Sequence, residues 1–352
     1  MSEVHIGNLV LKKAIIQGGM GVGISCSRLA GAVAHEGGMG VISTAQIGYG
    51  DPRFREQPEE TNLKTLPVEI KRAKELAQGN GVVAVNIMSV TQLYEDYVKT
   101  AIGAGIDAII SGAGLPLELP ALAKGTDVKI APVLSSFKAA KVLLNLWHKK
   151  HQSTADFLIV ESPYSGGHQG YNRNSLDHLD EINKIFEDDV KKVIELKKTY
   201  EEIYQKSIPV FVAGGVFDSV DVSHAMSLGA DGVQVGTRFI VTDECDANEN
   251  YKNAYILATK ADLTIIDSPV GMPARVLRNS FVERMMNGSE KITNCYNCLK
   301  ACDPSTAKYC ISEVLIKSAN GDTENGLLFC STNPDRINKI QSVKDVIADL
   351  GL

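Results

Sequence analysis

Eight short apolar runs, separated by stretches with helical periodicity, constrain the fold of this 352-residue chain more than any other feature. Each run is almost continuously hydrophobic, which is typical of parallel strands buried on both faces. The runs are residues 14–17, 40–43, 82–88, 107–113, 129–135, 157–162, 209–215 and 232–237. Repeated β–α units with eight strands predict an α/β fold of the TIM (β/α)8 barrel type, with a doubly wound sheet as the alternative.

The stretches between the runs carry residues that favour helix termini. We expect Ser25 or Ser27, Ser135 or Ser136, and Ser219 to cap three helices, because a hydroxyl at the N-cap accepts a bond from a free amide of the first turn. The long charged stretch 174–206 is expected to be a solvated barrel helix with a surface extension.

Charge and hydropathy exclude several classes of partner. The net charge is −6 and no strongly basic block occurs, so we expect no nucleic-acid partner. No apolar run approaches about 18 residues, and the first residues carry charges where a signal peptide needs an apolar core. We therefore expect a soluble, cytoplasmic protein without a membrane partner. The oligomeric state stays open, with a homodimer as one expectation.

Polar or glycine residues end all eight runs, and the last two ends form a pair. Barrels of this kind often bind phosphate with backbone amides that follow strands seven and eight. Gly214 and Gly215 follow the seventh run, and Gly236 and Thr237 follow the eighth. Tight turns alone would explain these glycines, but their joint position favours a phosphate site. Because no P-loop or dinucleotide fingerprint occurs, the phosphate belongs to a phosphosugar or to FMN.

Other strand ends suit a flat ring that lies close to the backbone. Small residues at the end of the first run allow close approach, and an asparagine at the third can bond to the edge of a ring. The candidate cofactor contacts at these ends are Gln17, Gly18, Gly19, Met20, Asn86, Ser135 and Glu161.

A histidine flanked by glycines follows the sixth run in the stretch ESPYSGGHQGY, residues 161–171. An imidazole can take or give a proton at neutral pH, and the glycines permit a tight turn toward a ligand. The alternative is a loop histidine without a role, which we assign to the other six. We predict that His168 is catalytic.

Seven motifs together resemble the nitronate monooxygenase family, formerly called 2-nitropropane dioxygenases, and its close relative, the flavin-dependent enoyl-acyl-carrier-protein reductase. They are IIQGGMG, VNIM, SGAG, VESPYSGGHQG, VAGGV, GADGVQVGTRF and SPVGMPAR, in the family's order between residues 15 and 275. The resemblance implies a barrel that holds FMN non-covalently, with the phosphate on the glycine turns and His168 as the catalytic residue. It also implies that Met20, Asn86, Gly166 and Gly167 surround the ring or ribityl chain.

Four of the seven cysteines crowd into sixteen residues near the C-terminus, with the spacing C-x2-C-x3-C-x7-C. They are Cys295, Cys298, Cys302 and Cys310. Such thiolates can bind a [4Fe–4S] cluster or Zn, or can pack as free thiols, and the spacing slightly favours the cluster. The C-x2-C-x3-C part resembles the cluster segment of flavin-dependent dienoyl-CoA reductases.

Three parts of the chain are expected: an FMN-binding barrel over 1–237, a substrate-covering insertion over 238–280, and a Cys-rich helical segment over 281–352 that closes on the barrel. The leading functional hypothesis is an FMN-dependent enzyme that oxidises alkyl nitronates with O2. The alternatives are an enoyl-thioester reductase that takes electrons from NAD(P)H and a non-catalytic flavin or iron–sulfur redox sensor. A (β/α)8 barrel with a phosphate site would by itself also fit a phosphosugar isomerase or lyase.

Overall fold

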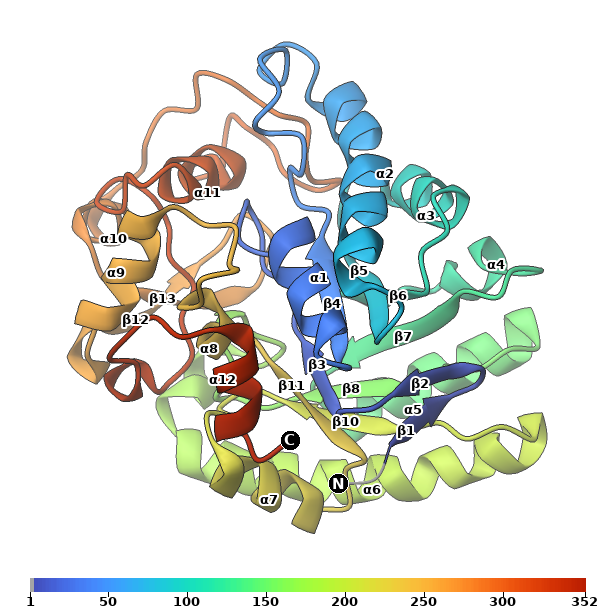
Figure 1. The fold of residues 1–352 in the computed structure, drawn as a ribbon. Coiled ribbons are helices and arrows are strands. Elements are labelled where there is room, and N and C mark those ends of the chain that lie inside the picture. Colours follow the sequence, from blue (N-terminus) through green and yellow to red (C-terminus); the bar gives the residue numbers. More distant parts are fainter. Residues whose placement is uncertain (1–2) are drawn as a thin grey trace.

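The computed structural model describes residues 3–352 and contains a closed barrel of eight parallel strands (Figure 1). Around the barrel the order is β10-β11-β3-β4-β5-β6-β7-β8. The predicted TIM barrel is thus confirmed, and every barrel strand falls inside one of the eight apolar runs or within one residue of it. The strands are β3 (Ile15–Gln17), β4 (Met39–Ser43), β5 (Val82–Met88), β6 (Ala108–Gly112), β7 (Lys129–Leu134), β8 (Leu158–Glu161), β10 (Val210–Ala213) and β11 (Gly232–Val235).

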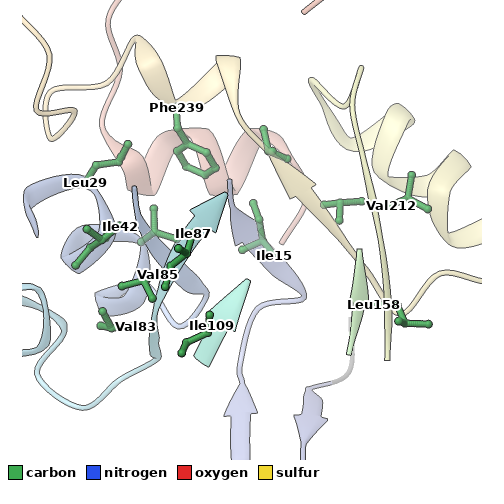
Figure 2. Packing of buried hydrophobic residues seen from close by; sticks show 14 of the residues in the cluster. Ile15, Leu29, Ile42, Val83, Val85, Ile87, Ile109, Leu158, Val212 and Phe239 are labelled. Carbon is green, nitrogen blue, oxygen red and sulfur yellow. The ribbon is translucent and has the colours of Figure 1, made fainter. Parts of the chain in front are cut away.

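Alternate residues of each strand enter two different cores. Val83, Val85 and Ile87 of β5 pack outward against the helices, in the cluster drawn in Figure 2. Val82 and Ala84 point into the barrel and join the interior cluster. Because the side-chain period of a strand is two, Asn86 continues the inward row at the carboxyl end. The same alternation makes β8 end on an inward-facing Glu161, two residues after the inward-facing Ile159.

A hairpin closes the amino-terminal end of the barrel. Strands β1 (Val4–Ile6) and β2 (Leu9–Leu11) pair antiparallel. Val4, Ile6 and Leu11 belong to the interior cluster of the barrel. This end is therefore filled with apolar side chains, which leaves the carboxyl ends of the strands for a ligand.

Helices surround the strands, and the charged stretch forms the longest of them, α6, as predicted. The barrel helices are α1 (Ser27–His35), α2 (Pro58–Ala77), α3 (Tyr94–Gly103), α4 (Leu119–Leu122), α5 (Phe137–Leu146), α6 (Leu179–Tyr204), α7 (Ser219–Ser227) and α8 (Thr237–Ile240). Helix α5 continues as a π-helical turn, Trp147–His151.

One of the three predicted helix caps is confirmed and two are wrong. Ser136 caps α5, and its side chain accepts a bond from the Ala139 amide. Helix α1 instead begins after Cys26, whose amide donates to the carboxylate of Asp246, a residue far away in the sequence. Helix α7 is capped by Asp218 rather than Ser219, because the carboxylate reaches the first-turn amides and forms a capping box.

The insertion and the C-terminal segment build a second layer over the mouth of the barrel. Strands β12 (Leu263–Asp267) and β13 (Pro273–Leu277) form a three-stranded sheet with β9 (Gly167–His168). Side chains from the insertion, from α10 (Ser280–Asn287) and from α11 (Ile311–Ala319) share one apolar cluster. Two further helices, α9 (Glu249–Leu257) and α12 (Val343–Asp349), pack instead into the cluster between the barrel strands and their helices, where α12 contacts α1 and α8.

The cysteine-rich stretch between α10 and α11, residues 288–310, contains no helix or strand, whereas a helical segment was expected over 281–352. It is attached to the barrel side of the molecule by an isolated bridge between Thr91 and Leu299. Among the described residues, no helix combines the length and hydrophobicity needed to cross a bilayer.

The cap of α7 provides a test of the fold. Replacing Asp218→Ala removes the acceptor of the first-turn amides and should lower the free energy of unfolding by about 1–2 kcal/mol. The control Ser219→Ala removes the hydroxyl that the sequence suggested as a cap and should change stability by less than about 0.5 kcal/mol. Urea denaturation measures both, and equal losses would contradict the assignment of the cap.

Candidate functional site

The carboxyl ends of the strands surround one cavity of about 250 Å³. Most of the residues predicted as cofactor contacts border it, together with His168. They are Gly18, Gly19, Met20, Asn86, Glu161, Gly166, Gly167, Gly214, Gly215, Gly236 and Thr237. The structure therefore brings residues from five strand ends and from the loop after β8 to one place.

Two predicted contacts, Gln17 and Ser135, do not border this cavity. Gln17 lies on the same face of β3 as Ile15, which packs outward, and its Oε1 accepts a bond from the Val41 amide. Ser135 is covered by the loop that follows β9, and its hydroxyl donates to the Gly170 carbonyl over 3.1 Å. Both side chains hold neighbouring backbone in place.

The turns after β10 and β11 present backbone amides to the cavity. Gly214 and Gly215 have φ angles of +89° and +79°, which side-chain-bearing residues rarely adopt. Among the described residues, no hydrogen-bond acceptor is found for the amides of Gly215, Val216, Gly236 and Thr237. Because backbone N–H groups are normally paired, four such donors at one cavity fit an anion such as the phosphate of a flavin nucleotide.

The first strand end is shaped for close packing. A Cβ on Gly19 would lie 2.4 Å from the Cβ of Asn86, so this position has no room for a side chain. Met20 lies next to Gly236, with its sulfur 3.6 Å from where a Cβ on that glycine would be. Small residues and one flexible thioether thus form a surface that suits a flat ring.

The insertion holds His168 on the rim of the cavity. Strand β9 pairs with β13, with His168 opposite Ala274. The Nε2 atom of His168 is 2.8 Å from the hydroxyl of Ser268, and its ring lies 5.0 Å from that of Phe329. Burial lowers the pKa of His168 to about 4, so the imidazole is neutral at pH 7. The bond to Ser268 is the one hydrogen bond that the ring makes within residues 3–352, so the other ring nitrogen, Nδ1, is available to a ligand.

A buried arginine holds the turn that precedes the histidine. The guanidinium of Arg275 donates to the carbonyls of Pro163, over 2.8 Å, and Ser165. Burial raises the pKa of the Glu161 carboxyl to about 7, and Arg275 opposes this rise. Glu161 therefore changes charge near neutral pH at the wall of the cavity.

The C-terminal stretch packs against the glycine turns after β10 and β11, and the individual residues that make these contacts were not predicted from the sequence. The Ser331 amide donates to the Thr237 hydroxyl over 3.1 Å, and the Asn333 side chain donates to the Gly215 carbonyl over 3.2 Å. A Cβ on Gly166 would meet the backbone of Cys330 at 2.6 Å, so the two segments touch. Residues 330–333 lie in no recognisable motif. Ser268 and Arg275, which contact the loop of His168, lie in the motif SPVGMPAR, and this motif could have revealed them.

The four clustered cysteines are close but do not form a ligand set. Cys298 is near enough to Cys295, Cys302 and Cys310 for their charges to raise its pKa, although burial is the larger cause and brings it to about 11. Within the described part of the chain, no three His, Cys, Asp or Glu side chains are placed to hold a metal ion. The metal site stays a prediction, which iron, zinc and sulfide analysis of the purified protein tests.

The family model described as nitronate monooxygenase matches residues 3–352. The chain belongs to the nitronate monooxygenase family. A probable nitronate monooxygenase of Staphylococcus saprophyticus is 24% identical over 307 residues, covering 81% of each chain. A carboxyl-CoA dehydrogenase of Mycobacterium tuberculosis, whose substrate group is a hydroxy-methyl-oxo-octahydroindene, is 27% identical over 280 residues, covering 79% of this chain and 67% of the relative.

Solved structures agree with this assignment. FabK from Thermotoga maritima superposes with a TM-score of 0.68 at 27% identity and covers 97% of this chain and 92% of its own. A nitroalkane oxidase from Streptomyces ansochromogenes has a TM-score of 0.71 at 20% identity, covers 97% and 95%, and supports the fold alone. Membership of this family makes the chain a flavin-dependent oxidoreductase that acts on small molecules.

The raised pKa of Glu161 predicts a pH-dependent cost to stability. Between pH 4.5 and about 7 the unfolded chain ionises this carboxyl while the folded chain keeps the proton, so folding loses stability as the pH rises. In flavin-free protein, the Glu161→Gln variant should therefore gain about 1–3 kcal/mol over the natural chain across this range and no more above it. The control Glu202→Gln, on the exposed face of α6, should show no such gain. Urea melts at pH 4.5, 6 and 8 test this, and a constant difference would contradict it.

Proposed function

We propose that the chain is an FMN-dependent enzyme of the nitronate monooxygenase type, which oxidises alkyl nitronates with O2. The observation that carries the proposal is the pairing of two features at one cavity: four amides at the ends of β10 and β11 for which the described residues supply no acceptor, and a neutral imidazole on the rim of the same cavity. The amides suit a phosphate monoester, and the cavity between them and His168 suits a planar ring. Membership of the family supports the same chemistry.

A bound flavin would supply the electron transfer that oxidation of a nitronate by O2 requires. The residues of the chain would bind and orient the reactants. Gly214, Gly215, Gly236 and Thr237 would hold the phosphate, and Gly18, Gly19, Met20 and Asn86 would contact the ring and its chain. Gly166 and Gly167 would let the backbone of the loop approach the ring, and Glu161 would lie beside it.

His168 would bind the reacting end of the substrate. A neutral imidazole can donate one hydrogen bond and accept another, and Ser268 takes the Nε2 atom. The free Nδ1 would therefore face the substrate, where it can bond to a nitro or nitronate oxygen or accept a proton from the neighbouring carbon. Because the ring is uncharged, it would not need to lose a proton before acting as a base.

A second candidate is a reductase that takes electrons from NAD(P)H and reduces an enoyl thioester. Two observations favour it: the motifs shared with flavin-dependent enoyl reductases, and relatives in M. tuberculosis and Rhodococcus jostii named as carboxyl-CoA dehydrogenases, at 27% and 26% identity. There His168 would bond to the thioester carbonyl. Aerobic turnover of propionate 3-nitronate, compared with anaerobic NADH consumption with crotonyl-CoA, separates the two candidates.

The catalytic assignment predicts the effect of removing the imidazole. The variant His168→Ala should keep its FMN but lose about 10²- to 10⁴-fold in kcat/KM with nitronate, the usual contribution of a positioned acid or base. The control His224→Ala removes an exposed imidazole of α7 and should keep full activity. Steady-state oxygen consumption with parallel flavin absorbance measures both. Unchanged activity in the His168 variant would refute the assignment.

The phosphate assignment predicts a loss of FMN at one glycine. The variant Gly215→Ala combines a φ of +79° with a Cβ 2.9 Å from Tyr164, so the turn must move, and FMN affinity should fall at least about tenfold. The control Gly125→Ala has the same φ of +79° but open space around its Cβ and lies far from the cavity. Fluorescence titration of flavin-free protein with FMN compares them. Equal affinities in the two variants would place the phosphate elsewhere.

A further inference from the structure

A second, smaller cavity of about 50 Å³ adjoins the first. The two share Thr44, Ala45, Met88, His168 and Leu315 in their walls. His168 thus stands between them, with one cavity holding the predicted cofactor contacts and the other lying beneath the cysteine-rich stretch. We call the second cavity the side chamber.

Apolar side chains form most of the surface of the side chamber. They are Val22, Leu93, Val270, Leu299, Ile311 and Leu315. Val22, Leu299, Ile311 and Leu315 are buried, with exposures of 1%, 7%, 6% and 8%. A surface of this kind is favourable only for a ligand group that is itself apolar.

Several polar residues in the wall are already paired with one another, including Glu59, whose carboxylate accepts a bond from Asn297. The Gly48 amide donates to Asn62, Asn62 donates to Gln46, and Gln46 donates to Ser312, over 2.8, 2.7 and 2.7 Å. This chain links α2 to α11 and leaves these amide groups little capacity to bind a polar ligand. The side chamber is therefore built to exclude polar groups rather than to recognise them.

The outer wall is fixed to the barrel by backbone bonds. The Gln92 amide donates to the Cys298 carbonyl over 3.1 Å, and the Lys300 amide donates to the Val90 carbonyl over 3.0 Å. Leu299, between these two anchors, presents its side chain to the chamber. These two bonds anchor the backbone on both sides of Leu299. They fix the position of this wall and therefore the depth of the chamber.

We propose that the side chamber binds the alkyl tail of the substrate whose reacting end lies at His168. This inference deepens the proposed function and rests on it for the position of the reacting end. A cavity needs about 10–15 Å³ to hold one water, so 50 Å³ has room for a chain of about three to five carbons. The preferred substrates are thus unbranched compounds with a short to medium apolar tail, and the cysteine-rich stretch determines their length.

Calorimetric titration with straight-chain carboxylates, from acetate to octanoate, tests the proposal on FMN-loaded protein. A carboxylate is planar and anionic like a nitronate but is not oxidised. The dissociation constant should fall about fourfold for each added methylene, then level off after about four or five carbons. The same series of nitronates, from nitroethane to 1-nitrohexane, should show a parallel rise in kcat/KM.

Three variants make the test specific. Leu93→Trp fills the chamber and should abolish the dependence on chain length. Leu299→Ala enlarges it and should move the plateau to chains one or two carbons longer, which a misfolded protein could not do. Leu257→Trp, at an 80% exposed position outside both cavities, should behave like the natural chain. Thermal melts and FMN content verify that each variant is folded.

The outcomes separate this proposal from the function on which it rests. Dissociation constants that do not change with chain length, or that change equally in Leu93→Trp and in the natural chain, would overturn the side chamber as the binding site. If carboxylates bind as expected but no nitronate is oxidised, the chamber stands and the proposed reaction falls. If nitronates are oxidised at rates independent of their length, the reaction stands and the chamber falls.

Discussion

The guanidinium of Arg275 holds together the two parts of the molecule that meet at the cavity. It is 3% exposed and donates to the carbonyls of Pro163 and Ser165, while its own strand pairs with the strand of His168. A buried charge is costly unless its donors are satisfied, so this arrangement strongly favours one position of the loop. The imidazole therefore has a fixed place above the barrel, although it belongs to a two-residue strand.

The barrel and the positions of its inward-facing residues could be predicted from the sequence because both depend on local pattern. Continuous apolar runs of strand length identify buried parallel strands, and the period of two decides which residue of each run faces inward. Asn86 and Glu161 reach the cavity for this reason. Gln17 does not, because it shares the outward face of its strand with Ile15. A prediction based on position at the end of a strand misses this difference unless the phase of each strand is counted.

The second layer of the site could not be predicted in the same way, because it depends on contacts between distant segments. Ser268 reaches His168 across 100 positions of sequence, and Asn333 reaches Gly215 across 118. Asp246 supplies the first-turn contact that a local serine was expected to make at α1. None of these pairs has a spacing or a composition that identifies it, and only packing brings them together. The stretch 288–310, without helix or strand, follows no periodicity at all.

Burial sets the charges at the cavity. It lowers the pKa of His168 to about 4 and raises that of Glu161 to about 7, so the rim holds a neutral base and an acid that titrates near neutral pH. The two titratable groups, His168 and Glu161, thus lie at the barrel mouth, while the side chamber next to it is mostly apolar. Under the proposed function, this separation would provide one place for a charged reacting group and another for a hydrocarbon tail, on the two sides of one imidazole.

A crystal structure of the flavin-loaded protein tests the central claim most directly. The account predicts an FMN phosphate within hydrogen-bond distance of the amides of Gly215 and Gly236, and a ring that lies between Met20 and His168. A phosphate bound elsewhere, or a ring on the far side of the loop from His168, would contradict it.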